Sequence, residues 1–270
     1  MKKAVILLFA IVVVYGCNQG PKHPQADIIN KKDPEPLTAE SIIHIADSID
    51  MNYMQLEKQH SLVYERNHEN SYLERFSTNG QPQLYIEYIR NEGVSSIVRK
   101  YYLVDSNLVL IRENREITKS DGNVFDETRT YLRNNVSFKQ DNRIGHSISE
   151  LRSLSFLDTK QYKESKLTED FGEKISSLDK MITGTETYEM VFDHFISAPD
   201  ASYIILKSQL PSDRSASIMV QDKSALTDSL TNYPALFKDK KLNLTWKIED
   251  GEAVYVPVAD NVTSANGLKR

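Results

Sequence analysis

A serine in a near-motif is the first residue of this sequence whose type and setting suit chemistry. Gly145-His146-Ser147-Ile148-Ser149 comes close to the G-x-S-x-G nucleophile elbow, but Ser149 holds the place of the second glycine. That glycine permits the strained strand-to-helix turn that exposes the nucleophile. Ser147 and Glu150 also have the spacing of a capping box, in which the serine begins a helix. A hydrolase that uses Ser147 with a nearby histidine is therefore kept as an alternative hypothesis.

The other candidates for catalysis or metal binding lack their companions. Ser177-Leu178-Asp179-Lys180 matches the S-x-x-K pairing of penicillin-recognising enzymes, yet S-D-N and K-T-G are absent from the chain. Asp193 and His194 lie on a predicted strand, so their side chains are expected on opposite faces and unable to pair. The histidines show no compact metal-ligand spacing; they are His23, His44, His60, His68, His146 and His194. The sequence therefore predicts no catalytic residue, no metal site and no cofactor.

Tyrosines are the most conspicuous candidates for binding. Seven lie close together, at Tyr64, Tyr72, Tyr85, Tyr88, Tyr101, Tyr102 and Tyr131. Tyrosine combines a rigid apolar ring with a hydroxyl, which suits recognition, although it is also common in any sheet. We expect a binding surface that exposes Tyr85, Tyr88, Tyr101 and Tyr102 on one sheet.

The segment that must position these tyrosines is predicted to be a helix followed by a β-meander. Thr38 suits a helix N-cap, and apolar residues recur at helical spacing from Ile42 to Leu56. From Leu62 to about Asp141, runs rich in Tyr, Ile and Val alternate with turn signals, which is typical of antiparallel strands. The turn signals are Asn79-Gly80, Asn91-Glu92-Gly93, Asp105-Ser106-Asn107, Asp121-Gly122 and Asn134-Asn135. Because several strands carry apolar residues on both faces, at least one helix should cover a face.

A helical connector is predicted after the meander. The capping box at 147–150 is followed by Phe171, Ile175, Leu178 and Ile182 at helical spacing, so residues 147–182 are expected to be mostly helical. Thr183-Gly184-Thr185 then breaks the helix, which marks a domain boundary.

The C-terminal segment shows the order of three strands, a helix and two strands. The strands are expected at 188–196, 202–208 and 215–221, the helix at 224–233, and the last two strands at 240–249 and 254–258. This is the element order of an OB-fold, a small five-stranded barrel. The run from Tyr233 to Trp246 resembles the helix-to-strand-four passage of periplasmic bacterial OB-like domains. Another small α+β domain is the alternative.

The N-terminus has the parts of an export signal. Lys2 and Lys3 precede an apolar run of eleven residues, which is too short for a bilayer span of about 20 residues. The run ends in Val14-Tyr15-Gly16-Cys17, which resembles the lipobox of bacterial lipoproteins. The resemblance covers residues 1–17. It implies cleavage between Gly16 and Cys17 and acylation of Cys17, which would anchor the chain to the lipid bilayer. A plain secretory signal or an N-terminal anchor helix is the alternative.

The residues after Cys17 agree with an anchored protein. Cys17 is the only cysteine, so an acylated chain would have no free thiol and no disulfide. Four prolines between residues 18 and 37 indicate a tether. By the sorting rule of Gram-negative lipoproteins, Asn18 in place of Asp implies the outer membrane. The absence of an acidic run at 18–22 favours its periplasmic side.

Charge limits the partners. The chain carries a net charge of −5, and residues 1–16 contain two lysines and no acidic residue, so the mature chain would carry −7. An acidic chain is a poor partner for nucleic acid. An envelope protein or a glycan remains as a partner class.

These observations together predict an α+β protein: an antiparallel β-meander with covering helices, followed by a small OB-like β-barrel. The expected parts are a signal peptide (1–16), a tether (17–37), the meander with its helices (38–182), the barrel (183–260) and a disordered tail (261–270). We expect a non-enzymatic binding or scaffolding lipoprotein of the cell envelope. The alternatives are an envelope hydrolase, acting through Ser147 with a nearby histidine or through a carboxylate–histidine pair, and a purely structural protein with no specific ligand.

Overall fold

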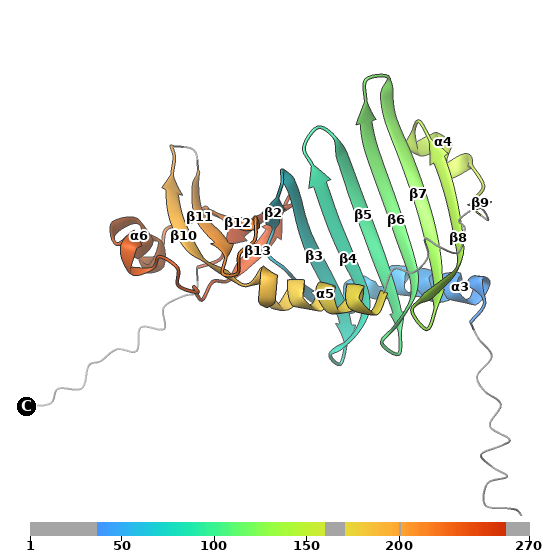
Figure 1. Ribbon diagram of the computed structural model, residues 1–270, viewed down its shortest axis with the longest axis horizontal. Helices are drawn as coiled ribbons and strands as arrows, with labels where there is room; N and C mark the ends of the chain where they lie inside the picture. Colours follow the sequence, from blue (N-terminus) through green and yellow to red (C-terminus); the bar gives the residue numbers. More distant parts are fainter. Residues whose placement is uncertain (1–36, 160–170, 200, 258–270) are drawn as a thin grey trace, which may run out of the picture. The chain divides into compact units, whose positions relative to one another are not determined.

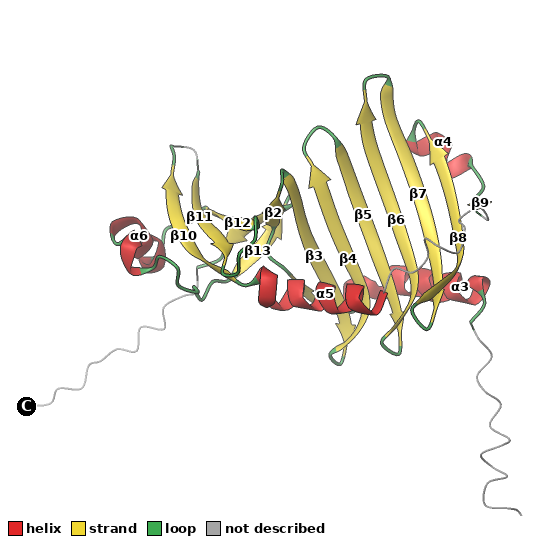
Figure 2. Ribbon diagram, in the orientation of Figure 1, coloured by secondary structure: helices red, strands yellow, loops and turns green. Residues whose placement is uncertain are grey.

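The computed structural model describes residues 37–159, 171–199 and 201–257. The predicted signal 1–16, Cys17, the tether up to residue 36 and the tail 261–270 lie outside these residues. The described residues from Thr38 onward belong to one compact unit. The fold class is α+β, as expected, with most strands joined in one large sheet (Figure 2).

The helices and strands are as follows. The α-helices are α3 (Ala39–Asn52), α4 (Ile148–Ser153), α5 (Phe171–Thr183) and α6 (Ala225–Asn232), with short 3-10 turns at η1 (Tyr53–Gln55), η3 (Glu186–Tyr188) and η4 (Pro234–Leu236). The strands before α4 are β1 (Glu57–His60), β2 (Tyr64–Arg66), β3 (Glu69–Thr78), β4 (Gln81–Asn91), β5 (Ser95–Val104), β6 (Asn107–Lys119), β7 (Gly122–Arg133) and β8 (Val136–Gly145). The later strands are β9 (Leu157–Asp158), β10 (Met190–Ser197), β11 (Ser202–Ser208), β12 (Ser215–Val220), β13 (Trp246–Glu249) and β14 (Glu252–Tyr255).

The predicted meander is present as strands β3 to β8, each antiparallel to the next. Three of its hairpins turn through two residues with positive φ, at Asn79-Gly80, Asp105-Ser106 and Asn134-Asn135. This geometry matches the twist of the flanking strands. In each of the three hairpins the register slips by one residue just after the turn, so all three contain a β-bulge at the same place.

Helices α3 and α5 cover opposite faces of the meander. Tyr102 points to α3, where its hydroxyl donates to Asp50, whereas its neighbour Tyr101 points to the other face and lies under Lys174 of α5. Neighbouring residues of a strand point to opposite faces, so the two helices must lie on either side of the sheet. Figure 1 shows α5 crossing in front of the strands and α3 passing behind them. The expectation of at least one covering helix is confirmed.

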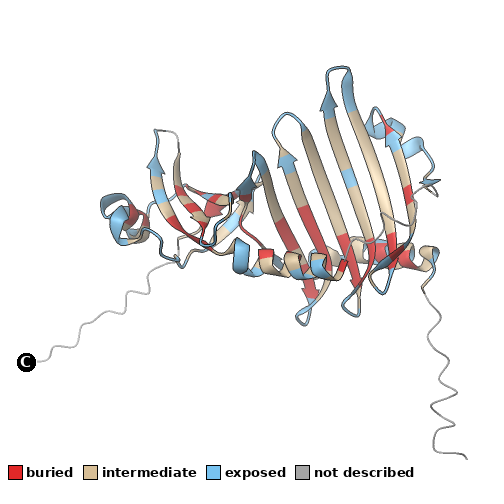
Figure 3. Ribbon diagram, viewed as in Figure 1, coloured by how far each residue is buried: buried red, intermediate tan, exposed pale blue. Residues whose placement is uncertain are grey.

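Burial is concentrated where the helices cross. Figure 3 shows a buried band through the strands near α5 and α3, with partly exposed residues towards the turns at 92–94 and 120–121. On the α3 side the band contains Ile42 and Ala46 of the helix, which begins at the predicted N-cap Thr38. On the α5 side it contains Leu178 and Phe171. Beyond the band, both faces of the same single sheet carry mainly polar side chains.

The connector after the meander is only partly helical. Helix α4 ends at Ser153, and the chain then runs along the outer edge of β8, where Leu157 pairs with Asn142. Phe156 is held there between two cations, because the guanidinium groups of Arg129 and Arg143 lie 3.6 and 4.4 Å from its ring. The expectation that residues 147–182 are mostly helical is thus wrong for residues 154–159. Pairing with an open strand edge and the cation–π contacts outweigh helix propensity there.

The C-terminal segment has the expected order of three strands, a helix and two strands. Strands β10, β11 and β12 form an antiparallel meander, and β14 pairs in parallel with β12 and antiparallel with β13. Strand β12 also pairs with β2, so sheet hydrogen bonds cross the predicted boundary at residue 183. The division into 38–182 and 183–260 stays a prediction.

The expected closure of these strands into a barrel is not found. Among the described strands, β13 pairs with β14 alone, and the strand expected over 240–249 begins only at Trp246. A bulge at Asp193 bends β10. Among the described residues of β10, Phe192 alone forms backbone hydrogen bonds to the segment before β13, with Asp239 and Lys240. Residues 241–244 instead line a cavity of about 230 Å³, together with Tyr64, Leu206 and Ile218.

Asp50 should contribute strongly to folding. Its carboxylate accepts hydrogen bonds from Lys100 Nζ at 2.7 Å, Tyr102 Oη at 2.8 Å and Arg112 Nη1 at 2.8 Å. Asp50→Ala should lower the free energy of unfolding by about 3 kcal/mol, because three partly buried donors lose their acceptor. Asp47→Ala is the matched control: Asp47 is 52% exposed and meets Arg112 alone, so its loss should cost about 0.5 kcal/mol. Urea denaturation followed by circular dichroism measures both, and equal losses would contradict the prediction.

Candidate binding site

The four tyrosines expected to form one exposed surface do not do so. Tyr85, Tyr101 and Tyr102 are at most 2% exposed, and only Tyr88 is half-buried. Tyr85 and Tyr101 face α5, whereas Tyr102 faces α3. The prediction of an exposed patch is therefore wrong for three of the four residues, because the covering helices bury them on opposite faces.

The buried tyrosine hydroxyls are bound to carboxylates. Tyr85 Oη donates to Asp179 Oδ1 at 2.6 Å, and Tyr101 Oη donates to Glu87 Oε2 at 2.6 Å. Burial raises the pKa of both phenols, and the neighbouring carboxylates raise it further. The Tyr85 bond holds α5 to the sheet, and the Tyr101 bond joins β5 to the buried Glu87 of β4. Both hydroxyls are therefore engaged within the protein and are not available to a ligand.

Tyr88 belongs to an aromatic pair that remains accessible. It lies directly opposite Tyr72 on the adjacent strand, and the two rings stack with centroids 4.5 Å apart and planes 12° apart. The Tyr88 hydroxyl donates to Glu74 at 3.3 Å, and Lys58 Nζ lies 2.6 Å from the same carboxylate. Burial and then Glu74 raise the pKa of Tyr88, so the phenol stays neutral. Both rings line a cavity of about 130 Å³.

A row of polar residues lies beside the aromatic pair. Asn70, Arg90 and Ser96 are cross-strand neighbours two positions along from Tyr72, Tyr88 and Val98, and therefore share their face. Because side chains two positions apart on a strand point to the same face, the row that contains Tyr72 and Tyr88 lies next to the polar row on one face of the sheet. All six residues line the cavity.

The cavity exists because the sheet forks beside β12. Ser215 and Ala216 of this strand pair with β2, whereas Ile218 and Met219 pair with β14. The turn of the β13–β14 hairpin, at Asp250-Gly251, comes to lie against the meander beside Arg90. Gly251 has a φ of +85° and its open side faces Arg90, with Nη1 3.8 Å from where a Cβ would stand.

A second, smaller cavity of about 90 Å³ adjoins the first. It shares Asn70, Gly251 and Glu252 with the first cavity and adds Tyr203 and Glu65. Together the two cavities form a groove along the fork, which we call the fork groove. It is lined by Val63, Glu65, Asn70, Tyr72, Tyr88, Ile89, Arg90, Glu92, Ser96, Ile97, Val98, Tyr203, Ser217, Met219, Asp250, Gly251, Glu252 and Ala253.

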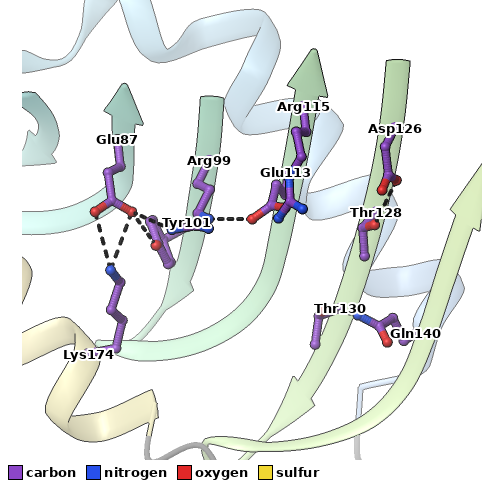
Figure 4. A network of polar contacts seen from close by, with 10 residues as sticks. All are labelled: Glu87, Arg99, Tyr101, Glu113, Arg115, Asp126, Thr128, Thr130, Gln140 and Lys174. Atoms are coloured by element: carbon purple, nitrogen blue, oxygen red, sulfur yellow. Dashed lines mark hydrogen bonds and ion pairs between the residues drawn. The ribbon is translucent and has the colours of Figure 1, made fainter. Parts of the chain in front are cut away.

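The opposite face of the meander carries a ladder of alternating charges, seen in Figure 4. Lys174 Nζ lies 3.3 Å from both oxygens of Glu87, and Arg99 stands between Glu87 and Glu113. Arg115 Nη2 continues the ladder to Glu113 at 2.6 Å. Further strands add the pairs Thr128–Asp126 and Gln140–Thr130. Opposite charges on neighbouring strands stabilise a sheet, so this network explains how a single layer tolerates a wet face.

The residues singled out for catalysis are in structural roles. Ser147 Oγ accepts the backbone N–H of Glu150 at 3.1 Å, and a Glu150 carboxylate oxygen accepts the N–H of His146 at 2.7 Å. This is the predicted helix cap. Within the described chain no histidine hydrogen-bonds to Ser147, whose hydroxyl otherwise meets Ser149. Lys180 of the S-x-x-K tetrad pairs with Glu186 at 2.9 Å.

Asp193 and His194 pair, contrary to the expectation. The bulge in β10 lies between Phe192 and His194, so the two side chains are no longer held on opposite faces, and Nδ1 of His194 lies 2.7 Å from Asp193 Oδ2. Lys238 donates to the other oxygen at 2.6 Å. Lys238 and then His194 lower the pKa of Asp193 to about 2. Half of the histidine is exposed, and the cluster forms a surface ion pair at the bent strand.

The described residues contain neither a metal-ligand cluster nor a membrane-spanning helix. No cluster of three or more His, Cys, Asp or Glu side chains is arranged to hold a metal ion there. No helix among these residues has the length and apolarity needed to cross a membrane. Comparison with protein-family models, with curated proteins and with solved structures found no match to the chain.

The residues of the fork groove, apart from Tyr88, were missed by sequence reasoning. Tyr72 was noticed as one of seven tyrosines, but nothing marked it as the partner of Tyr88. The turn signal at Asn79-Gly80 locates the β3–β4 hairpin, yet it does not show that the turn of the β13–β14 hairpin at Asp250-Gly251 lies against it. The groove depends on pairing between β12, β2 and β14, which are far apart in the sequence.

The buried phenols predict a loss of stability at alkaline pH. Their folded pKa values are raised, so the unfolded chain loses these protons first, near pH 10. The stabilisation is therefore complete below about pH 10 and falls as the pH rises above it. The double variant Tyr85→Phe/Tyr101→Phe should show a shallower fall of the unfolding free energy above that pH than the wild type.

Urea denaturation at a series of alkaline pH values measures this slope. Tyr233→Phe is the control for loss of a tyrosine hydroxyl, because Tyr233 is 63% exposed and lies outside these buried contacts. Lysine titration affects all three proteins alike. An unchanged slope in the double variant would show that the two phenols do not carry the effect.

Proposed function

We propose that the protein is a lipid-anchored component of the cell envelope that works by binding and not by catalysis. Its binding site in this proposal is the fork groove. The observation that carries the proposal is the accessible Tyr72–Tyr88 stack, which lines a cavity next to a polar row while the other clustered tyrosines on the meander are engaged in packing.

The anchor rests on the sequence alone. The lipobox-like run before Cys17, the absence of other cysteines and the proline-rich residues 18–37 all support it. Asn18 supports placement at the outer membrane, and the residues that follow support its periplasmic side. A tether of this length would leave the folded unit free to reach material near the membrane surface.

The groove has properties of a site for a polar ligand. It is concave, it combines two rings with side chains that donate and accept hydrogen bonds, and it is built on strands of one sheet, which hold it rigidly. Ser147, by contrast, is occupied as a helix cap. The version of the hydrolase alternative that uses Ser147 therefore has no observation in its favour.

An OB-like origin of the C-terminal strands is part of the proposal. The order β10, β11, β12, α6, β13, β14 and the parallel pairing of β12 with β14 support it. In this interpretation the seam between β10 and β13 has opened, and β2 has taken up the half of β12 that β14 leaves free.

Acylation should depend on Cys17. Cells that express the chain are given a radiolabelled or clickable fatty acid, and the protein is immunoprecipitated. The wild type should carry label and sediment with membranes, whereas Cys17→Ala should carry none. Ser147→Ala is the control for expression and handling. Equal labelling of wild type and Cys17→Ala would remove the anchor from the proposal.

A ligand should contact Tyr88 in living cells. Replacement of Tyr88 by the photo-crosslinker p-benzoylphenylalanine should give an adduct on irradiation, because this ring lines the groove. The same replacement of Tyr233, an exposed tyrosine outside the groove, measures random collisions. Mass spectrometry of the adducts identifies the partner. Identical adducts from both positions would exclude the groove as the binding site.

A further inference from the structure

We propose that the fork groove binds an uncharged oligosaccharide of at least two rings. This inference rests on the proposed function, since it names the ligand class for the same groove. It follows from three features of the groove: the order of its rows, the sign of its charges and its continuation into the second cavity.

The two rows match the two surfaces of a sugar. A pyranose ring presents C–H groups on a face and hydroxyls around its rim. The rings of Tyr72 and Tyr88 stack against each other, so such a face would pack on the outer surface of the pair, where it lines the cavity. Asn70, Arg90 and Ser96 stand one row away, about 7 Å along the strands, where they can meet rim hydroxyls. Asparagine and serine both donate and accept hydrogen bonds, as hydroxyls do.

The charges disfavour an anionic ligand. The first cavity is lined by one cation, Arg90, and by three carboxylates, those of Glu92, Asp250 and Glu252. A phosphate, a sulfated sugar or a uronic acid would meet net repulsion there. An uncharged sugar would not, and carboxylates accept hydrogen bonds from its hydroxyls. The negative charge of the whole chain acts in the same direction.

The second cavity provides for a second ring. It continues from the first through Asn70 and Glu252, and Tyr203 gives it an aromatic wall of its own. Tyr203 lies on β11 and approaches the groove from the opposite side of the fork. A disaccharide should therefore bind more tightly than its monosaccharide, and the gain should depend on Tyr203.

The test uses the full acylated protein in detergent micelles. An array of neutral and anionic oligosaccharides is screened first, and isothermal titration calorimetry then compares the best neutral disaccharide with its monosaccharide. At least one neutral disaccharide should bind. Tyr88→Ala should weaken its binding about tenfold, as loss of an aromatic stacking partner predicts. Tyr203→Ala should weaken the disaccharide but not the monosaccharide.

Controls separate binding from folding. Arg90 is exposed, so Arg90→Ala should fold normally and still weaken binding, and Tyr72→Phe should keep most affinity because the ring remains. Tyr233→Ala lies outside the groove and should change nothing. Circular dichroism checks each variant.

Three outcomes overturn the sugar proposal: no neutral oligosaccharide binds, only anionic ones bind, or Tyr88→Ala binds as the wild type does. If Tyr88 then crosslinks to a protein, the sugar is excluded and the fork groove stands as a binding site. If Tyr88 and Tyr233 crosslink alike, the proposed function fails as well.

Discussion

A sheet that must be covered on both faces is the constraint on which the rest of this structure depends. Strands β4 and β5 carry apolar or aromatic residues at consecutive positions, so neither face can be left to water. The chain meets this with α3 from before the meander and α5 from after it. Carboxylates on both helices accept tyrosine hydroxyls from the sheet, Asp50 from Tyr102 and Asp179 from Tyr85. Each bond satisfies a hydroxyl that burial would otherwise leave without a partner.

The two helices cover only part of each face of the sheet. The meander therefore has two kinds of surface, one under the helices and one beyond them. Under the helices the rows are apolar. Beyond them the rows alternate in charge, as in the row of Glu87, Arg99 and Glu113 on one face, whose Glu87 also pairs with Lys174 of α5. Such a ladder contributes modestly pair by pair, but it removes the need for a second layer. The polar half of the sheet is therefore free to carry a groove, which a sheet buried throughout could not.

The fold could be predicted from the sequence where local signals decide it. The turns at Asn79-Gly80 and Asn134-Asn135, the cap at Thr38 and the element order after residue 188 all follow from short-range chemistry. Closure of the barrel could not be predicted from such local signals, because it depends on whether the edges of two distant strands meet. A bulge at Asp193 and a late start of β13 are enough to keep the edges apart. The same bulge reverses the expectation for His194.

The candidate site shows most clearly what a sequence pattern leaves open. A two-residue turn at Asn79-Gly80 without any bulge would set Tyr72 opposite Glu87 and place Tyr72 and Tyr88 on different faces. Instead Gln83 is left out of the ladder, Phe76 pairs with Leu84, and the register moves by one residue. The two rings then stack on one face. A single bulge therefore turns a tyrosine-rich hairpin into an aromatic surface, and the fork at β12 supplies the walls around it. Neither the bulge nor the fork can be recognised from residue types. The sequence therefore marks the tyrosines only as a group. Which of them are buried partners of carboxylates, and which form an accessible pair, depends on the register of the folded strands.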